Sequence, residues 1–379
     1  MAWDVIIQAS ILGILIAVSG IMIGMFIVVS NQHLSSGAAN KLMSFKPLFM
    51  RRREIFRVAN RIRTGQSSAI VGLFSEEKSE ILRYLNNQDP LQRQQLYGDK
   101  ADVLLFSYID MAMDLSEQDT PAKFWETALS GIYRSVRIDS DIGRAYRFCV
   151  DTQFQKAELE DFLMALLRER KQLVLLVDQF EKVLDYSEFK NNWEFFTTLR
   201  RLATLQNPSL LTLVIASNLS LLRLHEEIQQ NQKTSPVLNF IEVTPIVGLF
   251  EAEADKLLKE EAPQLSVSQR NFVKDMTGGH PYLIKIITTH LAGETTNSSE
   301  QLEAIVCGKA RDSLKLILGS WSPTTRQILR QIKNQDHLSG FEKELNELAE
   351  QGIIVKKSDR WQIKAQIFEK CLDDIDFEP

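Results

Sequence analysis

The stretch Val71–Ile81 reads VGLFSEEKSEI, and it decides the fold of this chain. It has the frame G-x-x-x-x-G-K-[ST], in which a glycine-rich turn presents consecutive backbone N–H groups to phosphate. Gly72 opens the frame, and Lys78 and Ser79 close it at the correct spacing. Glu77 stands where the frame has its second glycine, and it adds bulk and negative charge near the expected phosphate oxygens. The sequence therefore predicts a nucleotide-binding fold whose nucleotide chemistry is weakened or lost.

The composition is that of a globular protein with room for two or three domains. The chain has 379 residues, of which 44% are apolar and 25% are charged. Its net charge of −5 gives no global reason to expect nucleic acid as a partner. Cys149, Cys307 and Cys371 lie far apart, and the histidines show no metal-binding spacing. We therefore expect neither a zinc site nor a disulfide framework.

Apolar runs alternate with helical segments through the first half of the chain. The predicted strands are Ser67–Leu73, Val103–Ile109, Leu173–Val177 and Leu210–Ala216. The predicted helices are Ser79–Leu85, Thr120–Ser135, Ala157–Arg170 and Asn192–Thr204. The apolar runs are continuous, as in strands that are buried on both faces. This order predicts an α/β fold with a parallel sheet and helices on both of its faces.

The third predicted strand ends at Asp178, where this type of fold places a Mg²⁺ ligand. Ser79 and Asp178 are thus the candidate metal ligands. The next residue is Gln179, an amide that cannot accept a proton as a general base. Glu181 replaces that base only if the following loop turns it inward, so Gln179 and Glu181 are the candidate catalytic positions. The alternative for Asp178 is an acid that ends a strand and caps a helix.

The segment Val5–Ser30 contains no ionisable residue. At about 1.5 Å per residue it is long enough to cross a hydrocarbon core of roughly 30 Å, so we expect a transmembrane helix within residues 1–30. The alternative, a cleaved signal peptide, requires a basic start and a shorter apolar core. The chain starts Met1-Ala2-Trp3-Asp4 instead, and residues 31–47 read as a polar linker.

Basic residues dominate the segment that follows. They are Lys41, Lys46, Arg51, Arg52, Arg53, Arg57, Arg61 and Arg63, against the single acid Glu54. This asymmetry places the N-terminus outside and the bulk of the chain in the cytoplasm, as in a bacterial inner membrane. The same cluster suits anionic lipid headgroups, or is simply the solvated start of the first domain. Within the apolar segment, Gly13, Ala17, Gly20 and Gly24 share one helix face, which predicts self-association unless it reflects the general frequency of glycine in such helices.

Three further motifs support a family resemblance. Phe49–Glu54 is similar to an F-V-G-R-x-x-E opening motif that contacts adenine, with Arg52 at its arginine and Arg51 in place of its glycine. Ser217-Asn218 stand at the position of a γ-phosphate sensor. Met276–Leu283 matches T-G-G-H-P-x-L-L closely, and it also reads as a Gly-Gly turn followed by a helix that starts with proline. From about residue 49 to residue 372, the chain resembles a STAND-type P-loop ATPase in the prokaryotic branch of the AAA+ superfamily.

The resemblance implies a domain order and a ligand set. After the membrane helix and the linker it implies a P-loop NTPase-like domain at 48–247, a helical lid at 248–308, and a winged-helix domain with an acidic tail at 309–379. It further implies that ATP or ADP binds with Mg²⁺. The implied nucleotide-binding residues are Gly72, Lys78, Ser79, Asn218, Pro281 and Arg52, with Mg²⁺ at Ser79 and Asp178.

The C-terminal region predicts three helices and a hairpin. The helices are Asp312–Leu318, Thr324–Lys333 and Gly340–Glu350, and the hairpin strands are 352–355 and 361–363. Winged helices can read DNA through their third helix. Here that helix carries four glutamates and one lysine, and such a surface repels DNA phosphates. We therefore expect protein partners at this helix and no nucleic acid.

Three nucleotide positions depart from the family pattern together, namely Arg51, Glu77 and Gln179. They remove phosphate contacts and the base that activates water, so efficient hydrolysis is not expected. The sequence predicts a membrane-anchored nucleotide-binding regulator or assembly platform, homo-oligomeric and with cytosolic protein partners, in bacterial signalling or defence. The alternatives are a slow ATPase that uses Glu181, a pseudo-ATPase scaffold, a nucleic-acid-binding module acting through residues 51–63, and a pore-forming effector.

Overall fold

The computed structural model describes residues 50–190, 192–205, 209–229, 238–291, 298–319 and 321–372. The predicted membrane segment Val5–Ser30, the linker and the acidic tail lie outside these ranges. In the part of the chain that is described, no helix has both the length and the apolar character needed to cross a bilayer. The chain from Met50 onward forms a compact unit of its own.

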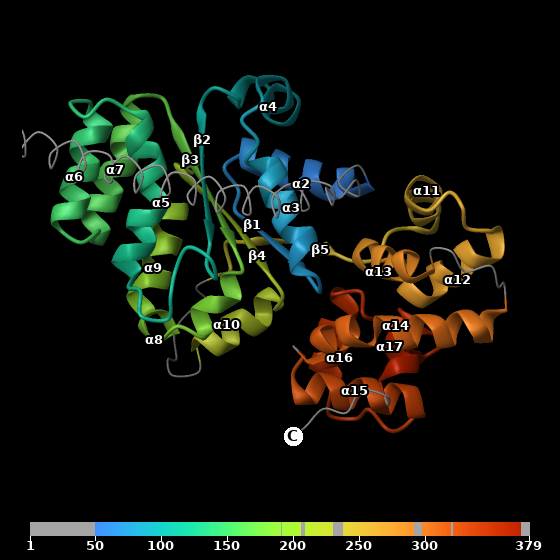
Figure 1. The fold of residues 1–379 in the computed structure, drawn as a ribbon. Helices are drawn as coiled ribbons and strands as arrows, with labels where there is room; N and C mark the ends of the chain where they lie inside the picture. The colour runs from blue at the N-terminus through green and yellow to red at the C-terminus, as the bar shows by residue number, and fades with distance from the viewer. Residues whose placement is uncertain are drawn as a thin grey trace, which may run out of the picture. The chain divides into compact units, whose positions relative to one another are not determined.

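A five-stranded parallel sheet forms the centre of the first part (Figure 1). Its order is β2-β3-β4-β1-β5, and each neighbouring pair is parallel. The strands are β1 (Ser68–Gly72), β2 (Leu104–Asp110), β3 (Gln172–Asp178), β4 (Leu211–Ser217) and β5 (Glu242–Ile246). The first four match the predicted strands, whereas β5 was not predicted. It is an edge strand with exposed positions and a proline, and its sequence lacks the apolar run on which the other predictions depend.

Helices cover both faces of this sheet (Figure 1). On one side lie α2 (Arg52–Arg63), α3 (Ser75–Leu85) and α4 (Pro90–Tyr97); on the other lie α5 (Pro121–Ser135), α6 (Asp141–Asp151), α7 (Lys156–Arg168) and α9 (Trp193–Ala203). Shorter elements are η2 (Gly98–Lys100), η3 (Phe180–Leu184), α8 (Ser187–Lys190) and α10 (Leu221–Gln229). Every position of β4 is buried, which confirms the prediction of a sheet covered on both faces.

The second part of the chain is helical, with one hairpin. Its elements are α11 (Glu251–Glu261), α12 (Val267–Thr277), α13 (Pro281–Leu291), α14 (Ser299–Gly319), α15 (Pro323–Asn334), α16 (Glu342–Glu350), β6 (Ile354–Lys357), β7 (Arg360–Ile363) and α17 (Gln366–Cys371). Their apolar side chains form one buried cluster, which also takes in Met50 and Phe74 from the first part. The division of this region into a lid and a winged helix stays a prediction.

The sheet topology brings the predicted site together. Parallel strands end at a common edge, so the loops after β1, β3 and β4 meet there. Val71 pairs with Ser217, and Asp110 pairs with Asp178, which aligns these strand ends. Gly72 is required at the end of β1, because a Cβ at this position would lie 2.8 Å from the carbonyl oxygen of Ile246 in β5.

Candidate functional site

The predicted phosphate loop is largely helical in the structure. Two residues connect Gly72, the last residue of β1, to Ser75, the first residue of α3. The helix was expected from Ser79, and it begins four residues earlier. Glu76 and Glu77 account for the correction, because glutamate forms helix far better than glycine and acids are favoured in the first turn. A two-residue connection leaves no extended loop to wrap a phosphate.

The lysine of the loop is buried and bonded within the protein. Lys78 is 1% exposed, and its Nζ donates to the carbonyl oxygen of Gly72 and to Oδ1 of Asn218, each at 2.7 Å. The Asn218 amide nitrogen donates to the Ser75 hydroxyl at 3.0 Å. The Ser79 hydroxyl donates to the carbonyl oxygen of Ser75 at 3.0 Å. Lys78, Ser79 and Asn218 are therefore all hydrogen-bonded to other protein atoms.

Arg51 and Glu77 form a buried ion pair. Nη2 of Arg51 lies 2.6 Å from Oε2 of Glu77, and the two side chains are 4% and 3% exposed. Nη1 of Arg51 donates to the carbonyl oxygen of Val247 at 2.6 Å. Oε1 of Glu77 accepts the backbone N–H of Tyr282, in the first turn of α13, at 3.2 Å. Two of the three departures from the family pattern are thus direct partners, and they link the loop to α13.

Phe74 adds an aromatic contact to the same junction. Its ring is 5% exposed and lies 5.3 Å from the ring of His280 and 5.0 Å from that of Tyr282, measured between centroids. His280 is 1% exposed, and burial lowers its pKa to about 4, so the imidazole is neutral at neutral pH. The loop is therefore packed into the apolar core of the second part.

The turn before α13 has the predicted form. α12 ends at Thr277, Gly278 and Gly279 have φ of +58° and +81°, and Pro281 is the first residue of α13. A Cβ at Gly279 would lie 2.7 Å from the carbonyl oxygen of Leu249. Both the positive φ and this close approach require glycine. The prediction of a Gly-Gly turn followed by a proline-started helix is confirmed.

β3 places Asp178 at the edge of the sheet, but the carboxylate already has two partners. Its Oδ2 accepts the Tyr108 hydroxyl at 2.9 Å, and its Oδ1 accepts the backbone N–H of Gln179 at 2.9 Å. Burial and the adjacent Asp178 raise the pKa of Tyr108, so the hydroxyl remains a donor. The side-chain amide of Gln179 donates to Oδ1 of Asp110 at 2.8 Å. Gln179 is therefore hydrogen-bonded to Asp110, the acid at the end of β2.

Glu181 is turned inward by the loop after β3. The residue is partly buried, and its Oε2 is screened from solvent with no hydrogen-bond partner among the described residues. Burial raises the pKa of Glu181, while the Lys78 ammonium and bonds at Ser217 and Asn218 oppose that rise. This is the orientation that the slow-ATPase alternative requires.

The arrangement does not fit a bound Mg²⁺–nucleotide. Lys78, Ser79 and Asp178 each bond to protein atoms, and the loop has no phosphate cradle. Within the described ranges, no group of three or more His, Cys, Asp or Glu side chains could hold a metal ion. Arg52 is exposed on α2 and lies outside the cluster, whereas Pro281 adjoins it through Tyr282.

Sequence reasoning missed the roles of Arg51, Tyr108 and Asp110. A signal for the first was present, because opposite charges replace glycines in two separate motifs, at positions 51 and 77. Charges that change together in this way indicate a contact. Tyr108 and Asp110 gave no such signal, since their roles follow only from the pairing of β2 with β3.

Buried Lys78 should make stability depend on alkaline pH. Burial lowers its pKa from 10.5 to about 8, so between these values the unfolded chain binds more protons and the free energy of unfolding rises with pH. We expect the stability of the wild type relative to Lys78→Met to increase by about 2 kcal/mol from neutral pH to about pH 9.5. Urea unfolding of both proteins at both pH values measures this. An unchanged difference would contradict a buried ammonium.

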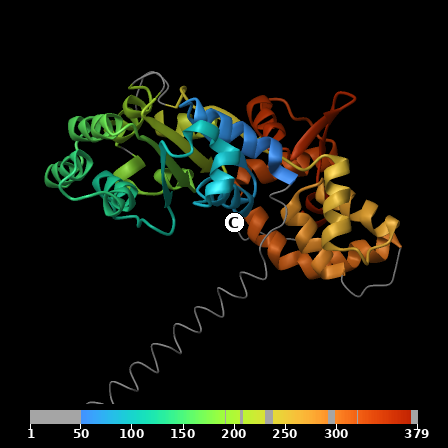
Figure 2. The ribbon, with the colours of Figure 1, turned by 90° about the horizontal axis from the view of Figure 1, so that it is seen from above.

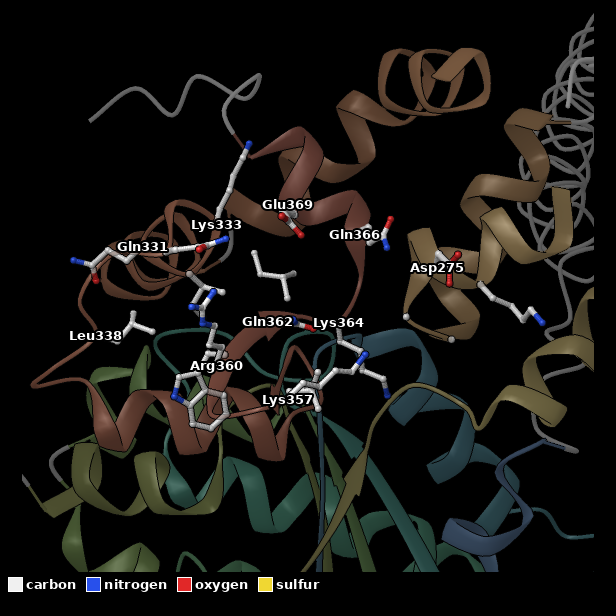
Figure 3. Close-up of a pocket in the computed structure, with 18 of the residues that line it drawn as sticks. Asp275, Gln331, Lys333, Leu338, Lys357, Arg360, Gln362, Lys364, Gln366 and Glu369 are labelled. Carbon is white, nitrogen blue, oxygen red and sulfur yellow. The ribbon is translucent and has the colours of Figure 1, made fainter. Parts of the chain in front are cut away.

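A cleft of about 1300 Å³ lies away from this cluster (Figure 3). It is bordered by α12, α15 and the β6–β7 hairpin, and no predicted site residue lines it. The charged side chains on its walls include Asp275, Lys333, Lys357, Arg360, Lys364 and Glu369. Because both signs are represented, the cleft does not specify the charge of a ligand.

α16 packs against the first part of the chain. Lys343 of α16 forms an ion pair with Glu226 of α10. Gln351, directly after α16, donates its side-chain amide to the carbonyl oxygen of Asn218 at 3.3 Å. α16 therefore contacts the first part of the same chain. Gln351, the residue after this helix, bonds to Asn218, which is also a partner of Lys78.

No protein-family model matches the chain, and no curated protein matches it in sequence. A Walker-type ATPase of Pyrococcus abyssi has a similar structure, with 13% identity and a TM-score of 0.54 over 85% of this chain and 95% of that one. The ORC2 protein of Aeropyrum pernix, solved as ADPNP-ADP complexes, matches 86% of this chain and 93% of its own, with 12% identity and a TM-score of 0.46. ORC1 of the same organism, solved with DNA, covers 86% and 92%, with 13% identity and a TM-score of 0.38.

The likeness to the Pyrococcus abyssi protein shows that the chain has a P-loop NTPase fold. The five-stranded parallel sheet and the position of the altered loop after β1 agree with it. At this identity the likeness concerns the fold alone, and the two weaker matches carry no argument about ligands.

Proposed function

We propose that this chain is a membrane-anchored regulatory protein of the STAND type within the AAA+ superfamily, and that it uses its ATPase fold as a scaffold without nucleotide turnover. One observation carries the proposal. Glu77, at the position of the loop glycine, bridges Arg51 and the backbone N–H of Tyr282 at 2.6 and 3.2 Å. The bridge supplies an internal anion at the loop and holds the loop against α13.

A nucleotide would have to break this bridge in order to bind at the loop. A micromolar nucleotide affinity corresponds to about 8 kcal/mol of binding free energy. Separating a buried ion pair costs about 3–5 kcal/mol. The binding free energy that remains corresponds to a dissociation constant roughly in the millimolar range. The β/γ-phosphate ligand Lys78 would also have to leave its two partners.

The site lacks both a general base for hydrolysis and a loop that could hold the phosphates. Gln179 stands at the catalytic position and is bonded to Asp110, and an amide does not accept a proton from water. Positioning and charge stabilisation supply most of the rate in phosphoryl transfer, and the closed loop supplies neither. These features favour the scaffold over a nucleotide-driven regulator.

The remaining parts of the proposal come from the sequence. Val5–Ser30 would anchor the chain, with its N-terminus outside and the P-loop fold in the cytoplasm of a bacterium. Self-association through the small residues of that segment and contacts with cytosolic proteins would make it an assembly platform in signalling or defence.

Calorimetry of residues 41–379 with Mg²⁺-ATP and Mg²⁺-ADP tests the scaffold. We expect no binding heat at ligand concentrations up to about 10 μM, where a millimolar affinity leaves the site nearly empty, in the wild type and in Lys78→Ala alike, because the loop is closed in both. The matched variant carries Arg51→Gly with Glu77→Gly, which restores both motif glycines, and we expect it to bind nucleotide at least about tenfold more tightly.

Two results would contradict the scaffold proposal. Wild-type binding that is lost in Lys78→Ala would make the protein a nucleotide-gated switch. A folded double-glycine variant that still binds nothing would show that the Arg51–Glu77 pair is not what closes the site.

A slow ATPase is the second candidate, because Glu181 faces Lys78. In that case Glu181→Gln should abolish turnover of radiolabelled ATP while leaving the fold intact. Turnover that is equal in the wild type and in Glu181→Gln would eliminate this candidate.

A further inference from the structure

α2 carries arginines on one exposed face. Its buried residues are Ile55, Val58, Ala59 and Ile62, and its exposed residues are Arg52, Arg53, Phe56, Arg57, Asn60 and Arg63. The spacing of each set follows the helical repeat, so each occupies one side of the helix. The exposed set contains four arginines and no acid, and we call it the α2 face.

The structure removes the other charges of α2 from this face. Arg51 is buried against Glu77. Arg61 donates to the Thr244 hydroxyl at 2.9 Å and lies 3.7 Å from a carboxylate oxygen of Glu242. The single acid of the helix, Glu54, is partly buried and lies 3.5 Å from Arg51. Among the described arginines between positions 51 and 63, the four of the α2 face are therefore the ones directed to the surroundings.

Two exposed aromatic rings accompany these arginines. Phe56 of the α2 face is 46% exposed, and Phe250, at the start of α11, is 64% exposed. The Arg53 guanidinium lies 5.1 Å from the centre of the Phe250 ring, and both views place the start of α2 next to α11 (Figure 2). A surface rich in arginine is attracted to anionic lipid headgroups, and exposed aromatic rings beside it add apolar contact at the headgroup boundary.

We propose that the α2 face binds the anionic headgroups of the bilayer in which the chain is anchored. The inference rests on the proposed membrane anchor, because residues 31–51 join Ser30 to Arg52 and a chain of this length spans at most about 80 Å. The face therefore stays within reach of the membrane surface. Duplex DNA also presents phosphates, but it offers no apolar boundary for Phe56 and Phe250. The observations favour lipid.

Vesicle sedimentation of residues 41–379 tests the proposal without the predicted membrane segment. The compact unit from Met50 onward is retained in this protein, with its apolar clusters. We expect binding to phosphatidylglycerol-containing vesicles and little binding to phosphatidylcholine alone. Each arginine near an anionic surface contributes about fivefold, so Arg53→Glu, Arg57→Glu and Arg63→Glu together should reduce binding by at least about a hundredfold. Raising the salt concentration should also weaken vesicle binding.

The matched control changes Arg134, Arg137 and Arg147 to glutamate. These arginines are also exposed, and they lie in or between α5 and α6, on the other side of the sheet. Phe56→Ser should weaken vesicle binding several-fold, whereas Phe148→Ser, at another exposed ring of 53%, should not. Circular dichroism verifies that each variant is folded.

Three results would overturn the proposal. The first is no binding to anionic vesicles at low salt, and the second is a loss of vesicle binding in the control triple variant equal to that in the α2 variant. The third is duplex DNA that binds as tightly as the vesicles and displaces them, whether or not Phe56 is present. The last would make the α2 face a nucleic-acid surface. None of these results depends on nucleotide binding, so failure here is distinguishable from failure of the scaffold. Because the tested protein lacks Val5–Ser30, failure of the anchor prediction is distinguishable too.

Discussion

Replacing Arg51 by alanine is expected to lower the free energy of unfolding by about 3–5 kcal/mol. The change leaves the Glu77 carboxylate, 3% exposed, without the guanidinium that lies 2.6 Å away. It also removes the donor to the carbonyl oxygen of Val247. An uncompensated buried charge is among the most destabilising consequences of a single substitution. Urea unfolding of residues 41–379 measures the loss.

Replacing Arg51 and Glu77 together should lower the free energy of unfolding far less than replacing Arg51 alone. Arg51→Met combined with Glu77→Leu replaces both charges by apolar side chains, and we expect most of the stability to return. Arg137→Ala is the matched control, because its ion pair with Asp139 is exposed and should contribute little. A loss for Arg51→Ala no larger than that for Arg137→Ala would show that the bridge does not hold the loop.

Phe74→Ala is expected to cost about 3–5 kcal/mol, because it empties a buried ring position. Its ring packs on His280 and Tyr282 within the core of the second part. Hydrogen exchange adds a local readout. The amides of Tyr282–Leu291 should exchange faster, since the loop and α13 lose their aromatic contact.

Phe148→Ala serves as the control for Phe74→Ala. The same side-chain deletion at a ring that is 53% exposed should change stability by no more than about 0.5 kcal/mol. Similar losses at both positions, or unchanged exchange in α13, would mean that Phe74 does not join the loop to α13.

Much of the sheet could be predicted from the sequence. β1, β3 and β4 are buried almost throughout, and burial on both faces leaves their apolar runs little freedom to be anything else. β2 is the other edge strand and is half-buried at four positions, and its largely apolar sequence was enough to predict it. β5 could not be predicted, because Glu242–Ile246 is a short edge strand with one proline and two exposed residues. It becomes a strand by pairing with β1, which is a tertiary contact.

The start of α3 shows where motif reasoning failed. The frame around Lys78 predicted a loop up to Ser79, because glycine frames of this kind form loops. Local propensity at Glu76 and Glu77 favoured helix instead, and the structure follows propensity. The altered residue therefore changes the backbone as well as the charge of the loop.

The sequence by itself determined the P-loop frame, the first four strands with the helices α3, α5, α7 and α9 between and after them, and the three departures at Arg51, Glu77 and Gln179. These depend on spacing and on apolar periodicity within each segment. Only the tertiary structure decided that Arg51 and Glu77 neutralise each other, that Gln179 holds Asp110, and that four arginines of α2 point outward. Each of these depends on which elements lie side by side, and contact between distant segments follows from sheet order and packing rather than from local pattern.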